Sequence, residues 1–144
     1  MSKQRQRAVA IILNKNEDED KILLMHRNRK GRVYYVFPGG GIEPGETPEQ
    51  ACLREVAEET SLHVTLSKKL FTFENQGNLE HYFLISQPQG QLKLGGPELL
   101  KQSPENQYRL EWISLTELPH IGVFPHEVIT PLLEHLTSTK GKQP

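Results

Sequence analysis

The chain has 144 residues, with 17 lysines and arginines against 18 aspartates and glutamates and a formal net charge of −1. This balance leaves no basic surplus that would favour a nucleic-acid polymer or an anionic membrane as partner. No apolar run approaches the ~20 residues that span a bilayer. The single cysteine, Cys52, excludes an intrachain disulfide and a cysteine-rich zinc site. We therefore predict one cytoplasmic domain over residues 1–144, with frayed ends at 1–6 and 138–144.

The first part of the chain is predicted to form three strands. The apolar runs that predict them are Arg7–Asn14, Lys21–Arg27 and Val33–Phe37. The acidic run Asn16–Asp20 predicts a solvated hairpin turn rather than a metal site, because nothing around it supplies ligand spacing. A basic loop, Arg27–Arg32, is expected before the third strand. Pro38–Gly41 ends that strand, since successive glycines permit positive φ and close approach to a ligand.

A helix is predicted from Pro48 to about Thr60. Thr47 is its N-cap, Pro48 occupies the first helical position, and Gln50 falls where a capping box needs Glu or Gln. The non-acidic side of the helix is expected to pack on the sheet through Cys52, Leu53, Val56 and Ala57. Cys52 is interpreted as a small core residue.

The rest of the chain is predicted to be rich in strands and to end in a helix. The strands are expected at His63–Phe73, Leu79–Ser86, Pro88–Leu94 and Tyr108–Leu115, the last strand of the chain. An irregular loop is expected over Glu98–Gln107, and a final helix from His126 to about Thr137. This order predicts a mixed β-sheet with the first helix on one face and the C-terminal helix on the other.

Three glutamates share one face of the first predicted helix. Glu55, Glu58 and Glu59 stand at i, i+3 and i+4. Each like-charge pair at this spacing costs roughly 0.2–0.5 kcal/mol, so helix stability alone does not favour the cluster. A hard divalent cation bound through oxygen would remove the repulsion. The alternative is a solvated helix face, which three glutamates alone form more often than a metal site.

The segment from Gly40 to Leu62 resembles the Nudix box, G-x5-E-x7-R-E-U-x-E-E-x-G-U, in which U is aliphatic. The matching positions are Gly40, Glu46, Arg54, Glu55, Val56, Glu58, Glu59 and Leu62. The one departure is Ser61 in place of glycine, where the chain is expected to enter the left-handed region or the helix to end differently. The resemblance implies a Nudix hydrolase with an α/β/α sandwich fold.

The resemblance also implies a metal cofactor, Mg²⁺, with Mn²⁺ as an alternative. Glu58 and Glu59 are its expected ligands, and a backbone carbonyl that we assign to Gly39 is another. Glu55 is either a ligand or the general base, a role for which Glu58 is also a candidate. Hydrolysis of a phosphoanhydride needs charge on the phosphate oxygens to be neutralised and a water to be activated, and a metal held by carboxylates serves both needs.

Two further roles are expected around this cluster. Arg54 is predicted to pair with Glu46 and so to orient the catalytic carboxylates. Family members often place another acidic ligand or base in the loop before the last strand. Chain position makes Glu105 the first candidate for that role and Glu98 the second.

Substrate contacts are predicted on the strand and loop that lead into the box. Arg27 or Arg32 is expected to approach substrate phosphates, although ordinary surface charge explains these arginines equally well. Tyr34, Tyr35 or Phe37 could stack on a base, and core packing explains these aromatic residues at least as well.

The expected reaction is cleavage of a nucleoside diphosphate linked to another group. A nucleoside triphosphate pyrophosphohydrolase is the first choice, with oxidised nucleotides among its candidate substrates. The asparagine with which MutT-type members read the base is not visible, because Phe124-Pro125-His126 occupies that region. The alternative is a non-catalytic sensor of a nucleotide or nucleotide sugar, which would normally carry a damaged box or a DNA-binding domain. Only the resemblance to the family suggests a homodimer.

Overall fold

The computed structural model of the protein describes residues 4–15 and 19–141, without the side chains at 15, 87, 97–98 and 138–141. The strands are β1 Arg5–Lys15, β2 Asp20–Arg29, β3 Arg32–Val36, β4 Gly39–Gly41, β5 His63–Asn75, β6 Asn78–Gln89, β7 Asn106–Ser114 and β8 Val123–Phe124. The helices are α1 Pro48–Thr60, α2 Gly96–Leu100 and α3 Ile129–Gly141, with 3-10 helices η1 Leu115–His120 and η2 His126–Val128. The turn predicted at Asn16–Asp20 lies largely outside the described residues.

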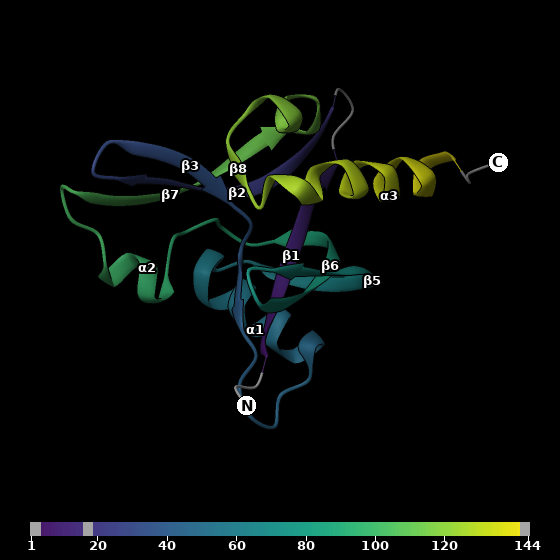
Figure 1. Cartoon of the computed structure of the whole chain (residues 1–144), viewed down its shortest axis with the longest axis horizontal. Helices are drawn as coiled ribbons and strands as arrows, with labels where there is room; N and C mark the ends of the chain where they lie inside the picture. Colours follow the sequence, from purple (N-terminus) through teal and green to yellow (C-terminus); the bar gives the residue numbers. More distant parts are fainter. Residues whose placement is uncertain (1–3, 16–18, 142–144) are drawn as a thin grey trace.

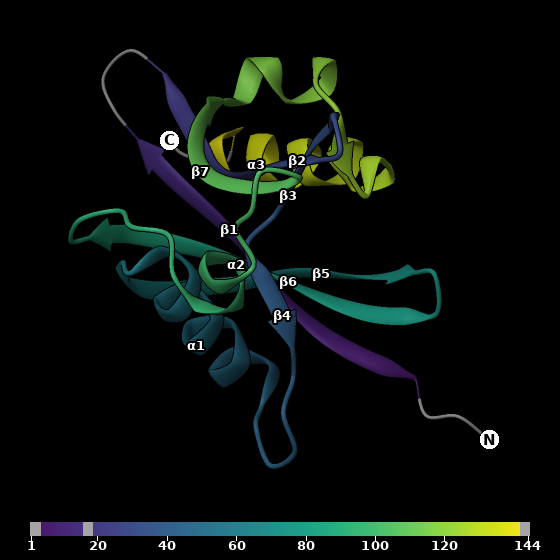
Figure 2. The same cartoon turned by 90° about the vertical axis from the view of Figure 1, so that its left-hand side faces the viewer.

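The eight strands in this part of the chain form one mixed sheet, which bends about β1 into two halves (Figure 1 and Figure 2). The main path is β5-β6-β1-β2-β3-β8, while β4 pairs with β1 and β7 pairs with β2. The β1–β6 and β3–β8 pairs are parallel. The first part of β1 pairs with β4 and β6 and its last part with β2, so this strand joins the two halves.

The alternation of side chains along β1 separates two cores, one on each face of the sheet. Ala8, Ala10 and Ile12 pack in one core with the buried face of α1. Val9, Ile11 and Leu13 pack in the other core with α3. The prediction of an α/β/α sandwich, with the two helices on opposite faces, is therefore confirmed.

The limits of α1 confirm the predicted helix and its capping box. The Thr47 hydroxyl accepts a hydrogen bond from the Gln50 backbone N–H, and the Gln50 side chain accepts one from the Thr47 N–H. Ser61 ends the helix in the left-handed region with φ 64°, and its N–H bonds to the Ala57 carbonyl. The prediction for the packed side is correct for Cys52 and Val56. It is wrong for Leu53 and Ala57, which are exposed.

The strand predicted at Pro88–Leu94 is wrong. Pro88 and Gln89 are the end of β6. This strand continues to Gln89 because Gln89 pairs with His63 of the long strand β5. Gly90 then takes φ 99° and breaks the strand, and residues 91–95 form neither strand nor helix. The irregular loop predicted at Glu98–Gln107 is also partly wrong, because it begins within α2 and ends within β7.

Two more boundaries differ from the prediction. The basic segment Arg27–Arg32 is a hairpin rather than a loop, with Lys30 and Gly31 as its turn and both arginines in strands. Tyr108–Leu115 is not the last strand, because β8 follows it and pairs with β3. A two-residue strand leaves too short a pattern to be predicted from its own sequence.

No helix within residues 4–15 and 19–141 is both long and apolar enough to cross a membrane.

Candidate active site

Arg54 on α1 lies at the centre of a cluster of carboxylates. Its Nε and Nη2 atoms donate to the two Glu46 carboxylate oxygens at 2.7 and 3.0 Å. Its Nη1 donates to Glu55 Oε1 at 2.9 Å and to Glu58 Oε2 at 3.3 Å. The hydrogen bond from Arg54 is the largest cause of a lowered pKa at the Glu46 carboxyl group. The same interaction is the largest cause of a raised pKa at the Arg54 guanidinium. The Arg54 guanidinium therefore holds Glu46 through two hydrogen bonds and also contacts Glu55 and Glu58, two of the predicted ligands.

The local charge is strongly negative. Arg54 Nη1 also lies 3.8 Å from Glu43 Oε1, so one guanidinium contacts four carboxylates. Glu55 and Glu58 together with Glu59 form what we call the acidic face of α1. Such an excess of carboxylate oxygens has the donor chemistry that Mg²⁺ prefers.

Glu59 is held against the glycine strand β4. The residue is 4% exposed, and its Oε2 accepts a hydrogen bond from the Gly39 backbone N–H at 2.9 Å. Gly39 takes φ 153°, and a Cβ there would collide with the Ala8 carbonyl of β1. At Gly40 a Cβ would lie 2.5 Å from the Glu55 carboxylate. Gly40 therefore leaves room for the Glu55 carboxylate to lie on the backbone of β4, whereas Gly39 lets β4 approach β1 closely.

The acidic face suits a divalent cation in chemistry and in space. Glu58 is the most open of its side chains, at 45% exposed, whereas the Glu55 side chain is 14% exposed. Within the described residues no three histidine, cysteine or acidic side chains already converge as a metal-binding group. Arg54 occupies the space between Glu55 and Glu58. The donors and the glycine cradle fit an oxygen-bound metal, provided that these side chains turn from Arg54 toward it.

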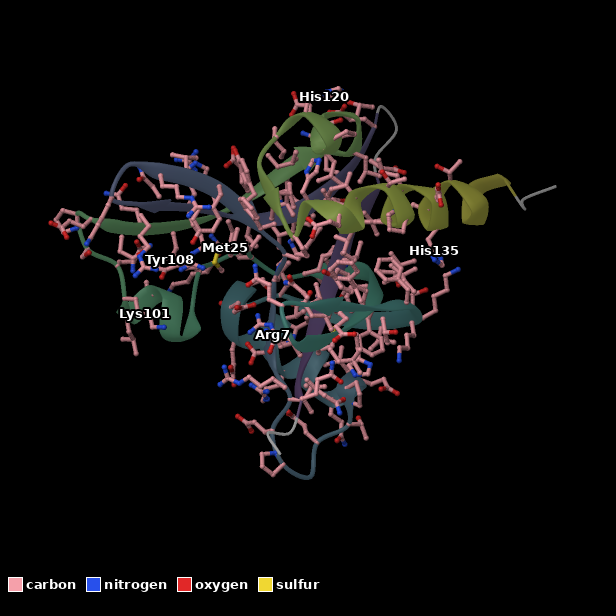
Figure 3. All side chains as sticks on the ribbon, viewed as in Figure 1. Arg7, Met25, Lys101, Tyr108, His120 and His135 are labelled. Atoms are coloured by element: carbon pink, nitrogen blue, oxygen red, sulfur yellow. The ribbon has the colours of Figure 1, made fainter. Side chains whose placement is uncertain are left out.

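The two arginines predicted to contact substrate lie together on the other half of the sheet. The Arg27 guanidinium lies 4.8 Å from the Tyr108 ring and 5.3 Å from the Tyr34 ring. The Arg32 guanidinium lies 5.4 Å from the Tyr34 ring and 5.6 Å from the Phe124 ring. Arg27 Nη2 donates to the Tyr108 hydroxyl, and Figure 3 labels Tyr108 on β7, above α2.

Of the aromatic residues considered for base stacking, two belong to the core. Phe37 is 8% exposed and packs edge-on against Tyr82. Tyr35 packs against the core on the α3 side and meets the His26 ring edge-on. Tyr34 differs, because it meets the half-exposed Phe124 ring. Of the three, Tyr34 is therefore the one on the more open surface.

The structure does not bring Glu105 to the acidic face. Glu105 is exposed beside the β2–β3 turn, where its carbonyl accepts a hydrogen bond from the Lys30 N–H at 2.7 Å. Among the contacts of the described residues, none joins its carboxylate to α1. Glu98 lies in α2, and its side chain is outside the described part of the structure.

A hollow that the sequence reasoning missed lies between β1, β6 and the segment before α3. It encloses about 410 Å³, and we call it the Glu80 pocket. Its polar and aromatic lining includes Arg7, Phe37, Glu80, Tyr82, Phe124 and Glu127. Figure 3 labels Arg7 on β1, close to the middle of the molecule. The sequence contains one indication of this hollow. Glu80 stands two residues before Tyr82, so both side chains lie on the same face of a strand, and that face is buried.

The sheet between two helices and the capped helix with its arginine-ordered carboxylates define a Nudix-type fold. Comparison with known families agrees, since the NUDIX domain family model matches residues 4–133. The chain therefore belongs to the Nudix family and is a Nudix hydrolase.

Individual proteins also resemble this chain. The putative 8-oxo-dGTP diphosphatase of Bacillus subtilis (strain 168) is 33% identical over 116 residues, which cover 79% of this chain and 69% of the relative. Diphosphoinositol polyphosphate phosphohydrolase 2 of Mus musculus is 42% identical over 67 residues, 46% of this chain and 37% of that protein. The solution structure of the E. coli ORF135 protein matches with a TM-score of 0.71 at 25% identity, covering 97% of this chain and 93% of that one.

Proposed function

We propose that this enzyme hydrolyses a phosphoanhydride bond in a nucleoside diphosphate linked to another group, with Mg²⁺ as cofactor and a nucleoside triphosphate, normal or oxidised, as substrate. The observation that carries the proposal is the set of four carboxylates around Arg54, next to Glu59, which is hydrogen-bonded to Gly39 of the glycine strand β4. A purely structural role leaves this excess of negative charge without a purpose.

Each residue of the site has a proposed role. Glu58, Glu59 and Glu55 would hold the metal together with the Gly39 carbonyl. When bound, Mg²⁺ would supply positive charge to the phosphate oxygens. Arg54, fixed by Glu46, holds Glu55 and Glu58 in the structure, and both carboxylates would turn from it toward the metal.

A general base must remove a proton from the attacking water. The candidates are Glu55, Glu58 and Glu105. The position of Glu105 beside the β2–β3 turn favours the two carboxylates of α1. Both lie on the helix that carries the proposed metal ligands, and both accept a hydrogen bond from the Arg54 guanidinium.

The names of the relatives point to two kinds of substrate, a nucleotide and a diphosphoinositol polyphosphate. The Glu80 pocket carries the carboxylates of Glu80 and Glu127 against one guanidinium, that of Arg7. A ligand with phosphates on every side would be repelled there, whereas a neutral base would not. The pocket therefore supports the nucleotide. Arg27 and Arg32, on the other half of the sheet, are proposed to contact its phosphates.

The test is release of phosphate or pyrophosphate from nucleoside triphosphates, nucleotide sugars and dinucleotides, with and without Mg²⁺. We expect metal-dependent turnover of one class, and Glu58→Gln should lower kcat roughly 100-fold or more, because it removes a metal ligand or base. Glu49→Gln is the matched control, since Glu49 is an exposed glutamate in the first turn of the same helix.

Two results would contradict the proposal. One is equal activity of Glu58→Gln and the wild type on the preferred substrate. The other is a lack of turnover across the whole panel while one nucleotide still binds, and that result would support the sensor instead.

A further inference from the structure

Glu80 is a buried carboxylate for which the proposed hydrolysis has no use. It lies on β6, is 5% exposed and lines the Glu80 pocket. A carboxylate in such a place normally has partners for its oxygens, because its desolvation is otherwise costly. The question is whether those partners satisfy Glu80 fully or leave it able to bind a ligand.

The partners of Glu80 leave part of its capacity open to the pocket. The Tyr82 hydroxyl donates to Oε1 at 3.1 Å, and Arg7 Nε lies 3.5 Å from Oε2. Burial, and next the Glu80 charge, raise the pKa of Tyr82, which keeps this hydroxyl protonated as a donor. A carboxylate has about four lone-pair sites on its two oxygens. Each oxygen of Glu80 can therefore accept one more hydrogen bond from a ligand.

The pocket and the acidic face lie on opposite faces of β1, and β4, which pairs with β1, lies beside both. Arg7 and Val9, which line the pocket, pair with Gly41 and Gly39. Phe37, also in the lining, stands two residues before Gly39, whose N–H bonds to Glu59. Two residues of chain span about 7 Å at most. A nucleotide that passes round β4 can therefore place its base in the pocket and its phosphates toward α1.

We propose that Glu80 reads the base of the substrate and selects a guanine-type base. The inference rests on the proposed function, which places the phosphates at α1. Guanine presents two adjacent donors, N1–H and the 2-amino group, which match the two oxygens of a carboxylate. Adenine and cytosine present an amino donor beside an acceptor, and uracil and thymine present one N–H between two carbonyls. Hypoxanthine keeps N1–H and lacks the amino group.

The experiment compares kcat/KM for GTP, ITP and ATP with Mg²⁺ in the wild type and in Glu80→Gln. The wild type should prefer GTP to ITP. Glu80→Gln should reduce the GTP/ITP ratio by roughly ten- to hundredfold, the worth of a hydrogen bond to a charged group. The GTP/ATP ratio should also fall, because an amide offers one acceptor and one donor, as adenine does. Ratios within one variant do not depend on how much of the protein is folded.

Glu74→Gln is the matched control, because Glu74 is an exposed glutamate in the same β5–β6 hairpin and lies outside the pocket lining. It should keep the wild-type ratios. If Glu80→Gln does not fold, Tyr82→Phe removes the hydroxyl that orients the carboxylate, and the GTP/ITP ratio should fall in the same direction.

Equal rates for GTP and ITP in the wild type would overturn the assignment, and so would an unchanged ratio in Glu80→Gln. Failure of the proposed function gives a different result, namely no hydrolysis of any nucleotide. In that case calorimetric titration of the wild type with GTP and ITP decides the role of Glu80. Tighter binding of GTP that Glu80→Gln abolishes supports the assignment, and equal binding overturns it.

Discussion

Arg54 is the side chain on which the geometry of the acidic face depends most directly, because it contacts Glu46, Glu55 and Glu58 at once. Lysine keeps the charge and loses the planar fork that holds Glu46 through two bonds. We expect Arg54→Lys to lower kcat/KM by roughly ten- to hundredfold, as is common for residues that orient metal ligands. The Mg²⁺ concentration that gives the half-maximal rate should rise as well, and steady-state kinetics at several Mg²⁺ concentrations measure both effects.

The control for this change is Arg109→Lys. Arg109 forms an exposed ion pair with Glu111 on β7, its side chain being 64% exposed, and such pairs contribute little. Activity and Mg²⁺ dependence should therefore stay as in the wild type. A similar loss in both variants, or an unchanged Mg²⁺ dependence in Arg54→Lys, would show that Arg54 does not position the ligands.

At the scale of single elements, the end of α1 is the place where this chain departs from the Nudix box. Ser61 takes φ 64°, and its hydroxyl donates to the Lys93 carbonyl at 3.0 Å. Ser61→Ala keeps the left-handed residue and loses this bond, which is worth roughly 0.5–1.5 kcal/mol. Ser61→Gly loses the same bond and relieves a conformational cost of about 1 kcal/mol or more. We therefore expect the glycine variant to be more stable than the alanine variant by about 1 kcal/mol.

Urea denaturation of the two variants beside the wild type measures this difference directly. Equal free energies of unfolding for the glycine and alanine variants would mean that the left-handed conformation of Ser61 costs nothing. Hydrolysis should be unaffected in both, since Ser61 touches no carboxylate of the acidic face in the described contacts.

The elements differ in how well they could be predicted, and the reason is the range of the contacts that determine them. The start of α1 depends on Thr47 and Gln50, which are three residues apart, and the Arg54 contacts stay within residues 41–58, from the end of β4 to α1. The length of β6 depends instead on β5, and the burial of Glu80 depends on Arg7 of β1. Contacts between residues so distant in sequence leave little local pattern. The spacing of Glu80 and Tyr82 alone does not predict a pocket, and so the Glu80 pocket was missed.

At the scale of the whole molecule, β1 carries the two parts of the site on its two faces. Ala8 and Ala10 pack toward α1, whereas Arg7 and Val9 line the Glu80 pocket. Small residues on the first side let the helix approach the sheet closely. A change in the pairing of β1 would therefore disturb the acidic face and the pocket together.

His81 ties β1 to the other strands of its half of the sheet. It is 8% exposed on β6, its Nδ1 lies 3.0 Å from Lys69 Nζ of β5, and its Nε2 lies 3.0 Å from Gln6 Oε1 of β1. An ammonium group can only donate, so Nδ1 accepts and Nε2–H donates. This arrangement requires the neutral ring. Burial first, and then the Lys69 charge, lower the pKa of His81, while Glu49 opposes the shift.

The stability of the fold should therefore depend on pH through His81. A lowered pKa in the folded state means that the unfolded chain binds the proton more readily, so the free energy of unfolding falls as pH falls through about 6.5. His81→Gln removes the titrating ring, and it should flatten the curve obtained by urea denaturation between about pH 7.5 and 5.5. His26, whose pKa is also lowered by burial and by Arg109, should leave a smaller slope. If the free energy of unfolding of His81→Gln varies with pH as steeply as that of the wild type, protonation of His81 does not destabilise the three strands. Lys69 would then turn away to solvent instead.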